Sequence, residues 1–259
     1  MDLGITGKTA LITGASRGIG RAAAFALARE GAKTMIVARG AEDLDATAAA
    51  LRAETGASTV TLAADVSKKA DIDRVAATVD AELGGADILV AICGSPRRGS
   101  FSDVGDDDLV RAFEATTLAV ARLVRAVTPR MKERGWGRIV TVQARSVVEP
   151  IPALTASNAT RPGVAGLMKD LARELGGDGI LVNTIVPGRI ATARFHEGAV
   201  QASENDDAYY RRQAAEIPVG RLGEAEEIAN VVAFLASERA SYVTGAAIRV
   251  DGGLIRAHV

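Results

Sequence analysis

Short apolar runs alternate with amphipathic, alanine-rich segments along the whole chain, and this alternation constrains the fold more than any other feature. An apolar run followed by a segment of helical period is a β–α unit, and its repetition predicts a parallel sheet with helices on both faces and right-handed crossovers. The fold class is therefore α/β, a doubly wound parallel sheet of about seven strands. The expected strands are 8–12, 34–38, 58–62, 87–93, 138–142, 180–186 and 247–250. The expected helices are 21–29, 43–54, 71–83, 107–133, 162–175 and 224–236. An interruption at Pro129 is the alternative for the long helix 107–133.

The length of 259 residues fits one domain of this class. No repeat, linker or low-complexity tract divides the chain, so residues 1–259 are expected to form a single domain. The longest segment without an expected strand, 189–220, includes the polar run 201–207 and is interpreted as a lid over the substrate pocket.

Charge and cysteine content exclude several classes of function. The 31 Lys and Arg against 32 Asp and Glu leave no basic excess to attract a phosphate backbone, so nucleic acid is not an expected partner. One cysteine, Cys93, and two distant histidines exclude a disulfide framework and leave no cluster for a metal. No apolar run reaches the ~18 residues of a membrane span, and no signal peptide is evident. We therefore expect a cytoplasmic protein with no membrane partner.

A glycine-rich segment, residues 13–20, lies between the first expected strand and the first expected helix. Gly14, Gly18 and Gly20 follow the spacing Gly-x-x-x-Gly-x-Gly, which permits a tight turn and close approach of a ligand to the backbone. The start of the helix then offers free N–H groups to a pyrophosphate. This context favours a Rossmann-type sheet that binds a dinucleotide, and a glycine-rich turn without a ligand is the alternative.

Further motifs accompany this loop: Asp65-Val66, Asp87-Ile88-Leu89-Val90 before Gly94, Gly137-Arg138-Ile139-Val140, Val182-Asn183, Pro187-Gly188 and Asp251-Gly252-Gly253. Together they resemble the short-chain dehydrogenase/reductase family over nearly the whole chain. The resemblance implies a nicotinamide dinucleotide cofactor, with the pyrophosphate and ribose at the glycine loop, the adenine at the end of the third strand and the nicotinamide after the sixth. The cofactor-binding residues that it implies are Gly14, Ser16, Arg17, Gly18, Ile19, Gly20, Asp65, Val66, Gly94, Arg161, Pro187, Gly188, Ile190 and Thr192.

The end of the second expected strand bears on the choice of cofactor. An acidic residue there would bond to the ribose 2′-hydroxyl of NAD, whereas arginine suits a 2′-phosphate. Ala38 stands where the acid usually lies, Arg39 follows it, and Arg17 adds a second cation. Because a guanidinium binds phosphate through two parallel hydrogen bonds, NADP(H) is preferred over NAD(H). The alternative is that Arg39 only faces water.

The resemblance also implies four catalytic positions, and all four are changed. Such enzymes protonate the substrate oxygen with a Tyr, place a Lys four residues later and a Ser thirteen residues earlier, and hold an Asn in the preceding long helix. Aligned on the flanking motifs, these positions fall on Ser157, Arg161, Ala144 and Thr116. A divergent, ketoacyl-carrier-protein-reductase-like subgroup is similar in carrying Ser-Asn-x-x-Arg after a Pro-Ile-Pro stretch such as 150–152.

Ser157 and Arg161 are the candidate catalytic residues. A serine hydroxyl is a weaker acid than a phenol, and arginine steadies an anion but keeps its own proton. Ser146 is an alternative hydroxyl if the loop after Ala144 is shifted. Other candidates are His196, Tyr209 and Tyr210 as proton donors, Arg97, Arg98 and Arg145 as sites for an acidic substrate, and Cys93 as a small hydrophobic residue rather than a nucleophile.

Three functions follow. The first is an NADP(H)-dependent oxidoreductase acting on a carbonyl or alcohol with an atypical proton source. The second is a catalytically inactive dinucleotide-binding protein or scaffold. The third, a lyase or dehalogenase, fits least, because halohydrin dehalogenases keep the Ser and Tyr and lose the glycine loop. The resemblance also implies a homotetramer or homodimer and a small-molecule substrate, with a hydrophobic ketone, an acyl thioester and an acid all open.

Overall fold

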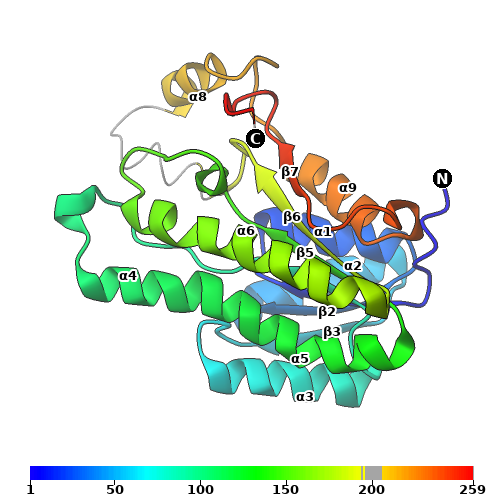
Figure 1. Ribbon diagram of the computed structural model, residues 1–259. Helices are drawn as coiled ribbons and strands as arrows, with labels where there is room; N and C mark the ends of the chain where they lie inside the picture. The colour runs from blue at the N-terminus through cyan, green and yellow to red at the C-terminus, as the bar shows by residue number, and fades with distance from the viewer. Residues whose placement is uncertain (194, 196–205, 259) are drawn as a thin grey trace.

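One sheet of seven parallel strands lies between two layers of helices in the computed structural model, which describes residues 1–193, 195 and 206–258 (Figure 1). The strand order is β3-β2-β1-β4-β5-β6-β7. This confirms the predicted doubly wound sheet. The strands are β1 (Thr9–Thr13), β2 (Lys33–Ala38), β3 (Thr59–Ala63), β4 (Ile88–Ala91), β5 (Gly137–Val142), β6 (Ile180–Pro187) and β7 (Ala247–Val250).

Two apolar cores cover the two faces of the sheet. Adjacent residues of β1 enter different cores, Leu11 one and Ile12 the other, because side chains alternate along a strand. The core around Ile12 packs under α1 (Gly18–Arg29), α2 (Ala41–Thr55) and α9 (Ala225–Leu235). The core around Leu11 packs under α3 (Lys69–Leu83), α5 (Ala119–Arg134) and α6 (Thr155–Leu175), and Figure 1 shows these three helices in front of the sheet. Among the helices of the described residues, none is long and apolar enough to cross a membrane.

The expected long helix 107–133 is divided, but not at Pro129. It consists of α4 (Asp106–Phe113), a π-helical turn (Glu114–Leu118) and α5, which runs through Pro129 without ending. Pro129 is exposed, so the carbonyl that its missing N–H leaves unpaired lies at the helix surface. At the π turn, Thr116 Oγ1 donates to the carbonyl of Ala112 at 2.7 Å, a side-chain bond of the kind that bends helices.

Helix α6 begins at Thr155, seven residues before the expected start at Pro162. Pro162 was expected at the first helical position, but it lies inside the helix on its exposed face. The correction matters for the site, because Ser157 and Arg161 are then one turn apart on a single helix.

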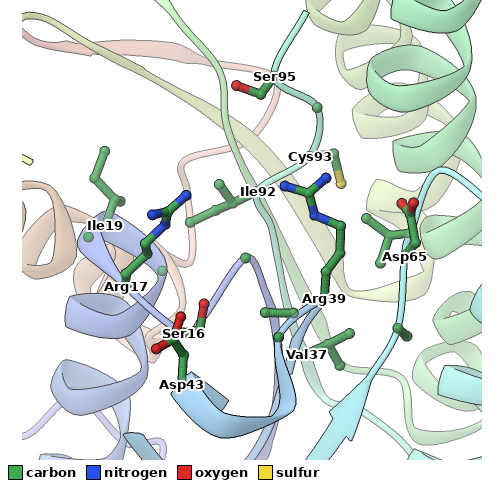
Figure 2. A pocket seen from close by; sticks show the side chains of 18 of the residues that line it. Ser16, Arg17, Ile19, Val37, Arg39, Asp43, Asp65, Ile92, Cys93 and Ser95 are labelled. Atoms are coloured by element: carbon green, nitrogen blue, oxygen red, sulfur yellow. The ribbon is translucent and has the colours of Figure 1, made fainter. Parts of the chain in front are cut away.

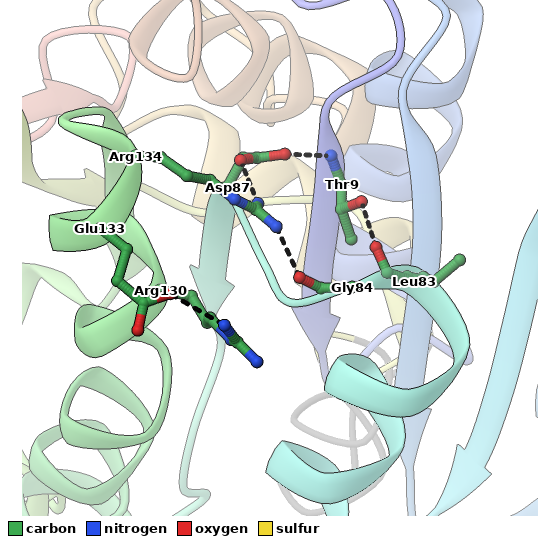
Figure 3. A network of polar contacts seen from close by, with 7 residues as sticks. All are labelled: Thr9, Leu83, Gly84, Asp87, Arg130, Glu133 and Arg134. Carbon is green, nitrogen blue, oxygen red and sulfur yellow. Dashed lines mark hydrogen bonds and ion pairs between the residues drawn. The ribbon is translucent and has the colours of Figure 1, made fainter.

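A polar network holds the amino-terminal ends of β1 and β4 together (Figure 3). The carboxylate of Asp87 accepts from the backbone N–H of Thr9 at 2.8 Å and pairs with Arg134 at the end of α5. Arg134 also donates to the carbonyl of Gly84, and Thr9 Oγ1 donates to that of Leu83. Side-chain hydrogen bonds and an ion pair therefore stabilise the amino ends of these strands.

At the carboxyl ends of the strands, the topology leaves one crevice between loops. After β1 the chain builds β2 and β3 on one side, then returns to β4 on the other side of β1. The loops that follow β1 and β4 therefore leave in opposite directions, and ligands of such sheets bind in the crevice between them. The remaining elements among the described residues are α8 (Asp206–Ala214) and four short 3-10 turns, Phe101–Asp103, Arg145–Val147, Gly176–Asp178 and Glu238–Ala240.

Candidate functional site

An open cavity of ≈ 840 Å³ lies at the carboxyl ends of β1, β2 and β4, in the crevice that the topology predicts (Figure 2). Most residues expected from the sequence to hold a dinucleotide line it. They are Gly14, Ser16, Arg17, Gly18, Ile19, Gly20, Arg39, Asp65, Val66, Gly94 and Thr192. The remaining lining was not singled out as cofactor-binding from the sequence: Val37, Ala38, Gly40, Asp43, Ala64, Ser67, Ile92, Cys93, Ser95, Ala115 and Ala193.

The glycine loop has a shape that only glycine permits at its tightest point. A Cβ on Gly20 would lie 2.2 Å from the carbonyl oxygen of Gly14, so no other residue fits there. Gly14 and Gly18 have φ of 64° and 54°, in the left-handed region. Within the described chain, α1 starts without a side-chain cap or an acidic first turn. Its first N–H groups are thus left for an anion.

Helix α2 and strand β2 hold the glycine loop in place through hydrogen bonds. Thr47 Oγ1 donates to the carbonyl of Ser16 at 3.1 Å, and the N–H of Ala15 donates to the carbonyl of Val37 at 3.2 Å. The loop is therefore fixed to the same β2–α2 unit that carries Arg39.

Two guanidinium groups reach into the cavity, Arg17 from the loop and Arg39 from the end of β2 (Figure 2). The position before Arg39 is Ala38, which brings no carboxylate. Asp43 lines the same cavity from the first turn of α2. Asp65 is engaged within its own loop, where its carboxylate accepts from the N–H and hydroxyl of Ser67 at 3.0 and 2.7 Å.

The loop after β4 forms the opposite wall. Thr13 Oγ1 accepts from the N–H of Ile92 at 2.9 Å and donates to its carbonyl, which ends β4 earlier than the sequence predicts. Gly94 follows with φ of 68°, and a Cβ there would lie 2.5 Å from Thr116 Cγ2 on the π turn. Cys93 is buried, and burial raises the pKa of its thiol to about 11. That thiol is a poor nucleophile at neutral pH.

A buried polar cluster adjoins this wall. The Arg161 guanidinium is 8% exposed and donates from Nε to Ser157 Oγ at 3.2 Å, from Nη1 to Gln143 Oε1 at 2.8 Å and from Nη2 to the carbonyl of Gly94 at 3.0 Å. Because Gly94 lines the cavity, Arg161 links Ser157 to the expected cofactor site.

Ser146 joins this cluster. Ala144 is extended, and the 3-10 turn Arg145–Val147 then directs Ser146 toward α6, where its Oγ lies 2.9 Å from Ser157 Oγ. Both hydroxyls are buried, at 3% and 4% exposure. The sequence suggested Ser146 only as an alternative, because its contact with Ser157 depends on this turn.

Gln143 also belongs to this cluster, through a contact with Arg161 that no motif of the sequence indicated. It directly follows β5, and a buried polar side chain at the end of a strand was the available signal. Its Oε1 holds Arg161, while its buried Nε2 has no hydrogen-bond partner within the described chain.

Other residues singled out from the sequence lie elsewhere. Pro187 ends β6, Gly188 and Ile190 follow it, and none of the three lines the cavity. Within the expected lid 189–220, residues 194 and 196–205, with His196, lie outside the described residues. In the described remainder of that segment, Tyr209 and Tyr210 pack on Phe195 with ring centroids 5.1 Å apart, and Arg189 donates to the carbonyl of Gln213 and to Glu216. Outside it, Arg97 pairs with Asp108, and Arg145 pairs with Glu149.

Residues 14–255 match the family model described as enoyl-(acyl carrier protein) reductase. The 3-oxoacyl-[acyl-carrier-protein] reductase of Escherichia coli is 39% identical over 96% of this chain and 97% of that protein. The crystal structure of L-sorbose reductase from Gluconobacter frateurii, complexed with NADPH and L-sorbose, is similar with a TM-score of 0.96 and 35% identity, over 99% of this chain and 100% of that one. An NADPH-bound short-chain oxidoreductase from Pseudomonas aeruginosa, described as containing an atypical catalytic center, is similar with a TM-score of 0.91 and 32% identity, over 98% and 99%.

Proposed function

The chain belongs to the short-chain dehydrogenase/reductase family, and from this premise we propose that it is an NADP(H)-dependent oxidoreductase that interconverts a carbonyl compound and an alcohol with an atypical proton source. The observation that carries the proposal is the pair of guanidinium groups, Arg17 and Arg39, that line the cavity. At the end of β2, beside Arg39, the chain has Ala38 instead of an acidic residue. NADPH in the similar solved structures supports it.

The residues present fit this cofactor. The uncapped start of α1 suits a pyrophosphate, and two cations at the β2 corner suit a 2′-phosphate. The pyrophosphate would be held by Gly14, Ser16, Gly18, Ile19 and Gly20, and the 2′-phosphate by Arg17 and Arg39. The adenine would be held by Asp65 and Val66. The nicotinamide end would be held by Gly94, Arg161, Pro187, Gly188, Ile190 and Thr192.

When bound, the nicotinamide supplies or accepts the hydride. The chain itself must hold the substrate oxygen and move a proton to or from it. In the alignment of motifs, Thr116, Ala144, Ser157 and Arg161 take the positions of the Asn, Ser, Tyr and Lys that the family uses. Arg161 keeps a permanent positive charge 3.2 Å from Ser157 Oγ, which stabilises negative charge on that oxygen. Ser157 is therefore the proposed proton donor, and Arg161 the charge that assists it.

The burial of Ser157 favours a second candidate function, dinucleotide binding without turnover. At 4% exposure its hydroxyl is already engaged by two neighbours, and it does not line the cavity. A protein that senses the nucleotide or acts as a scaffold needs the cavity but not the hydroxyl.

Two measurements on cofactor-stripped protein separate these functions. Calorimetric titration with NADPH and NADH is expected to give tighter binding of NADPH. NADPH oxidation is then followed with a ketone panel of cyclohexanone, L-sorbose and acetoacetyl-coenzyme A, which covers a hydrophobic ketone, a ketose and a 3-oxoacyl thioester. Tight binding with oxidation supports the oxidoreductase. Tight binding without oxidation supports the second function, and absence of binding would refute both.

We also propose a homodimer or homotetramer. Val110 and Phe113 project from α4 with 59% and 46% exposure, an apolar surface of the kind that interfaces cover. Light scattering is expected to give two or four times the chain mass of 26.7 kDa, and a single 26.7 kDa species would contradict this.

A further inference from the structure

The hydroxyl groups of Ser146 and Ser157 have one proton more than their contacts use. Arginine only donates, so Ser157 Oγ accepts from Arg161 Nε. The contact between the two hydroxyls at 2.9 Å uses one of their two protons. Within the described residues, neither Oγ has a further partner, so one buried O–H is left to donate to a third oxygen.

The position of the charge decides which hydroxyl donates outward. Arg161 Nε bonds to Ser157 and not to Ser146, so negative charge is better stabilised on Ser157 Oγ. Ser157 reaches its greatest acidity when it accepts from both Arg161 and Ser146 and donates its own proton onward. In that arrangement Ser146 is the inner donor.

Building on the proposed function, we propose that Ser146 is a positioning and proton-relay residue: its hydroxyl donates to Ser157 Oγ, so that Ser157 donates to the substrate oxygen, and it then returns a proton to Ser157. In the reduction direction, the Ser157 O–H bond breaks and the substrate O–H bond forms. The electron pair left on Ser157 Oγ takes the proton of Ser146. Ser146 takes a proton from a water molecule, and the hydroxide that remains is neutralised by a proton from the buffer. The hydroxyl that Ala144 lacks is thus supplied two residues later.

Gln143 is a positioning residue in this unit. Its Oε1 holds Arg161 Nη1 at 2.8 Å while the carbonyl of Gly94 holds Nη2 at 3.0 Å. Because Nη1 and Nη2 are held by these two acceptors, the plane of the guanidinium is fixed, and its Nε–H is directed toward Ser157 Oγ. Removing the amide oxygen is expected to weaken this alignment without removing the charge.

The unit contains no group that changes charge near neutral pH. Hydroxyl, amide and guanidinium groups all keep one protonation state between about pH 6 and pH 9. A Tyr–Lys pair, by contrast, titrates as the Lys charge draws the pKa of the phenol toward that range. The hydride-transfer rate is therefore expected to be flat across this pH interval in the wild-type protein.

The test compares Ser146→Ala with Ser146→Thr, which keeps the hydroxyl, and with the distant control Ser241→Ala. Three quantities are measured: NADPH affinity by calorimetry, binding of the ketone panel to NADP⁺-loaded protein by saturation-transfer NMR, and the rate of NADPH oxidation from pH 6 to 9. All variants are expected to bind NADPH like wild type. Ser146→Ala is expected to lower turnover about 10²-fold, because Ser157 loses the group that returns its proton, and to weaken ketone binding, because the Ser157 hydroxyl loses the donor that directs it outward. Ser146→Thr is expected to stay within about threefold of wild type.

Several outcomes would overturn the inference. One is Ser146→Ala with unchanged ketone binding and turnover, and another is Ser146→Thr as impaired as Ser146→Ala. The absence of any ketone signal from NADP⁺-loaded wild-type protein also overturns it. A protein that binds no NADPH fails the proposed function instead, so the two failures are distinguishable. Gln143→Glu, which keeps an acceptor for Arg161, is expected to retain more turnover than Gln143→Leu, and equal loss would argue against the positioning role.

Discussion

Single side chains determine the electrostatics of both halves of the site. At the β2 corner, Arg39 and Arg17 face the cavity and Ala38 provides no carboxylate to oppose a phosphate. On the other side of the cavity, Arg161 is a cation that cannot lose its proton, and it donates to Ser157, Gln143 and Gly94, which come from three different segments of the chain. Under the proposed function, the planar guanidinium matters in both places as well as the charge, because lysine would not offer the same fixed donors.

Arg39→Ala is expected to lower NADPH affinity about tenfold to a hundredfold and leave NADH affinity nearly unchanged. A hydrogen bond to a charged partner contributes about 1.5–3 kcal/mol, and only NADPH carries the 2′-phosphate. Calorimetric titration of both dinucleotides checks this, with Arg29→Ala as the control because Arg29 pairs with Glu54 outside the cavity. Equal losses for the two dinucleotides would show that Arg39 does not select between them.

Elements act through the places where their regular geometry is broken. The π turn Glu114–Leu118 brings Thr116 under Gly94, and the 3-10 turn Arg145–Val147 brings Ser146 to Ser157. The π turn contributes Ala115 to the cavity wall, and the 3-10 turn connects to that wall through Ser157, Arg161 and Gly94. The sheet holds these turns in place, and the turns position the functional groups.

Gly94→Ala is expected to abolish NADPH binding and lower stability. The new Cβ would lie 2.5 Å from Thr116 Cγ2 and 2.7 Å from the Ala115 carbonyl oxygen, so the cavity wall must move. Gly56→Ala is the matched control, because Gly56 has a similar φ of 66° with nothing within 4 Å of the new Cβ. The control is expected to lose about 1 kcal/mol of stability from backbone strain and to bind NADPH normally. Normal NADPH binding by Gly94→Ala would contradict this view of the wall.

Glu227→Gln is expected to lower the stability of the protein at pH 7 and to have little effect at about pH 2. Bonds from Arg221, and then from the N–H of Glu224, lower the pKa of Glu227 to about 2. Since this folded-state pKa lies below the ordinary glutamate pKa of 4.5, the carboxylate stabilises α9 above about pH 4.5, and that contribution is lost as the pH falls toward 2. Urea unfolding of both proteins at pH 7, 5 and 3 measures the difference, and a difference that stays constant with pH would be inconsistent with it.

The sequence predicted the sheet but not the cluster at its edge, for physical reasons. Runs such as 34–38 and 138–142 show their burial by composition alone, and Gly20 marks the loop because no side chain fits there. The start of α6 was misplaced because Pro162 resembles a first helical residue, although it lies on an exposed face inside the helix. The contact between Ser146 and Ser157 depends on a three-residue turn and on that helix start, which no local pattern encodes.

At the scale of the whole molecule, the two edges of the sheet have different roles. The carboxyl edge carries the cavity, where the loops after β1 and β4 diverge. The amino edge carries the network around Asp87, which joins β1, β4 and the end of α5 (Figure 3). The residues that we expect to bind the cofactor and the residues that stabilise this part of the sheet thus lie at opposite ends of the same strands.

Arg134→Met is expected to lower the melting temperature and leave NADPH affinity unchanged. The Asp87 carboxylate, at 9% side-chain exposure, would lose its ion-pair partner while keeping the N–H of Thr9. Thermal unfolding and calorimetric titration measure the two effects on one preparation. A loss of NADPH affinity would show that the two edges are coupled and contradict this division.

The central claim is that the chain transfers hydride from NADPH although its proton donor is a serine pair. The most direct test is to incubate the protein with NADPH deuterated at C4 and the ketone panel, and to search for deuterated alcohol by mass spectrometry. The account predicts deuterium in at least one product, and none with the double variant Ser146→Ala, Ser157→Ala. Tight NADPH binding with no deuterated product from any panel member would contradict it and leave binding without turnover as the function.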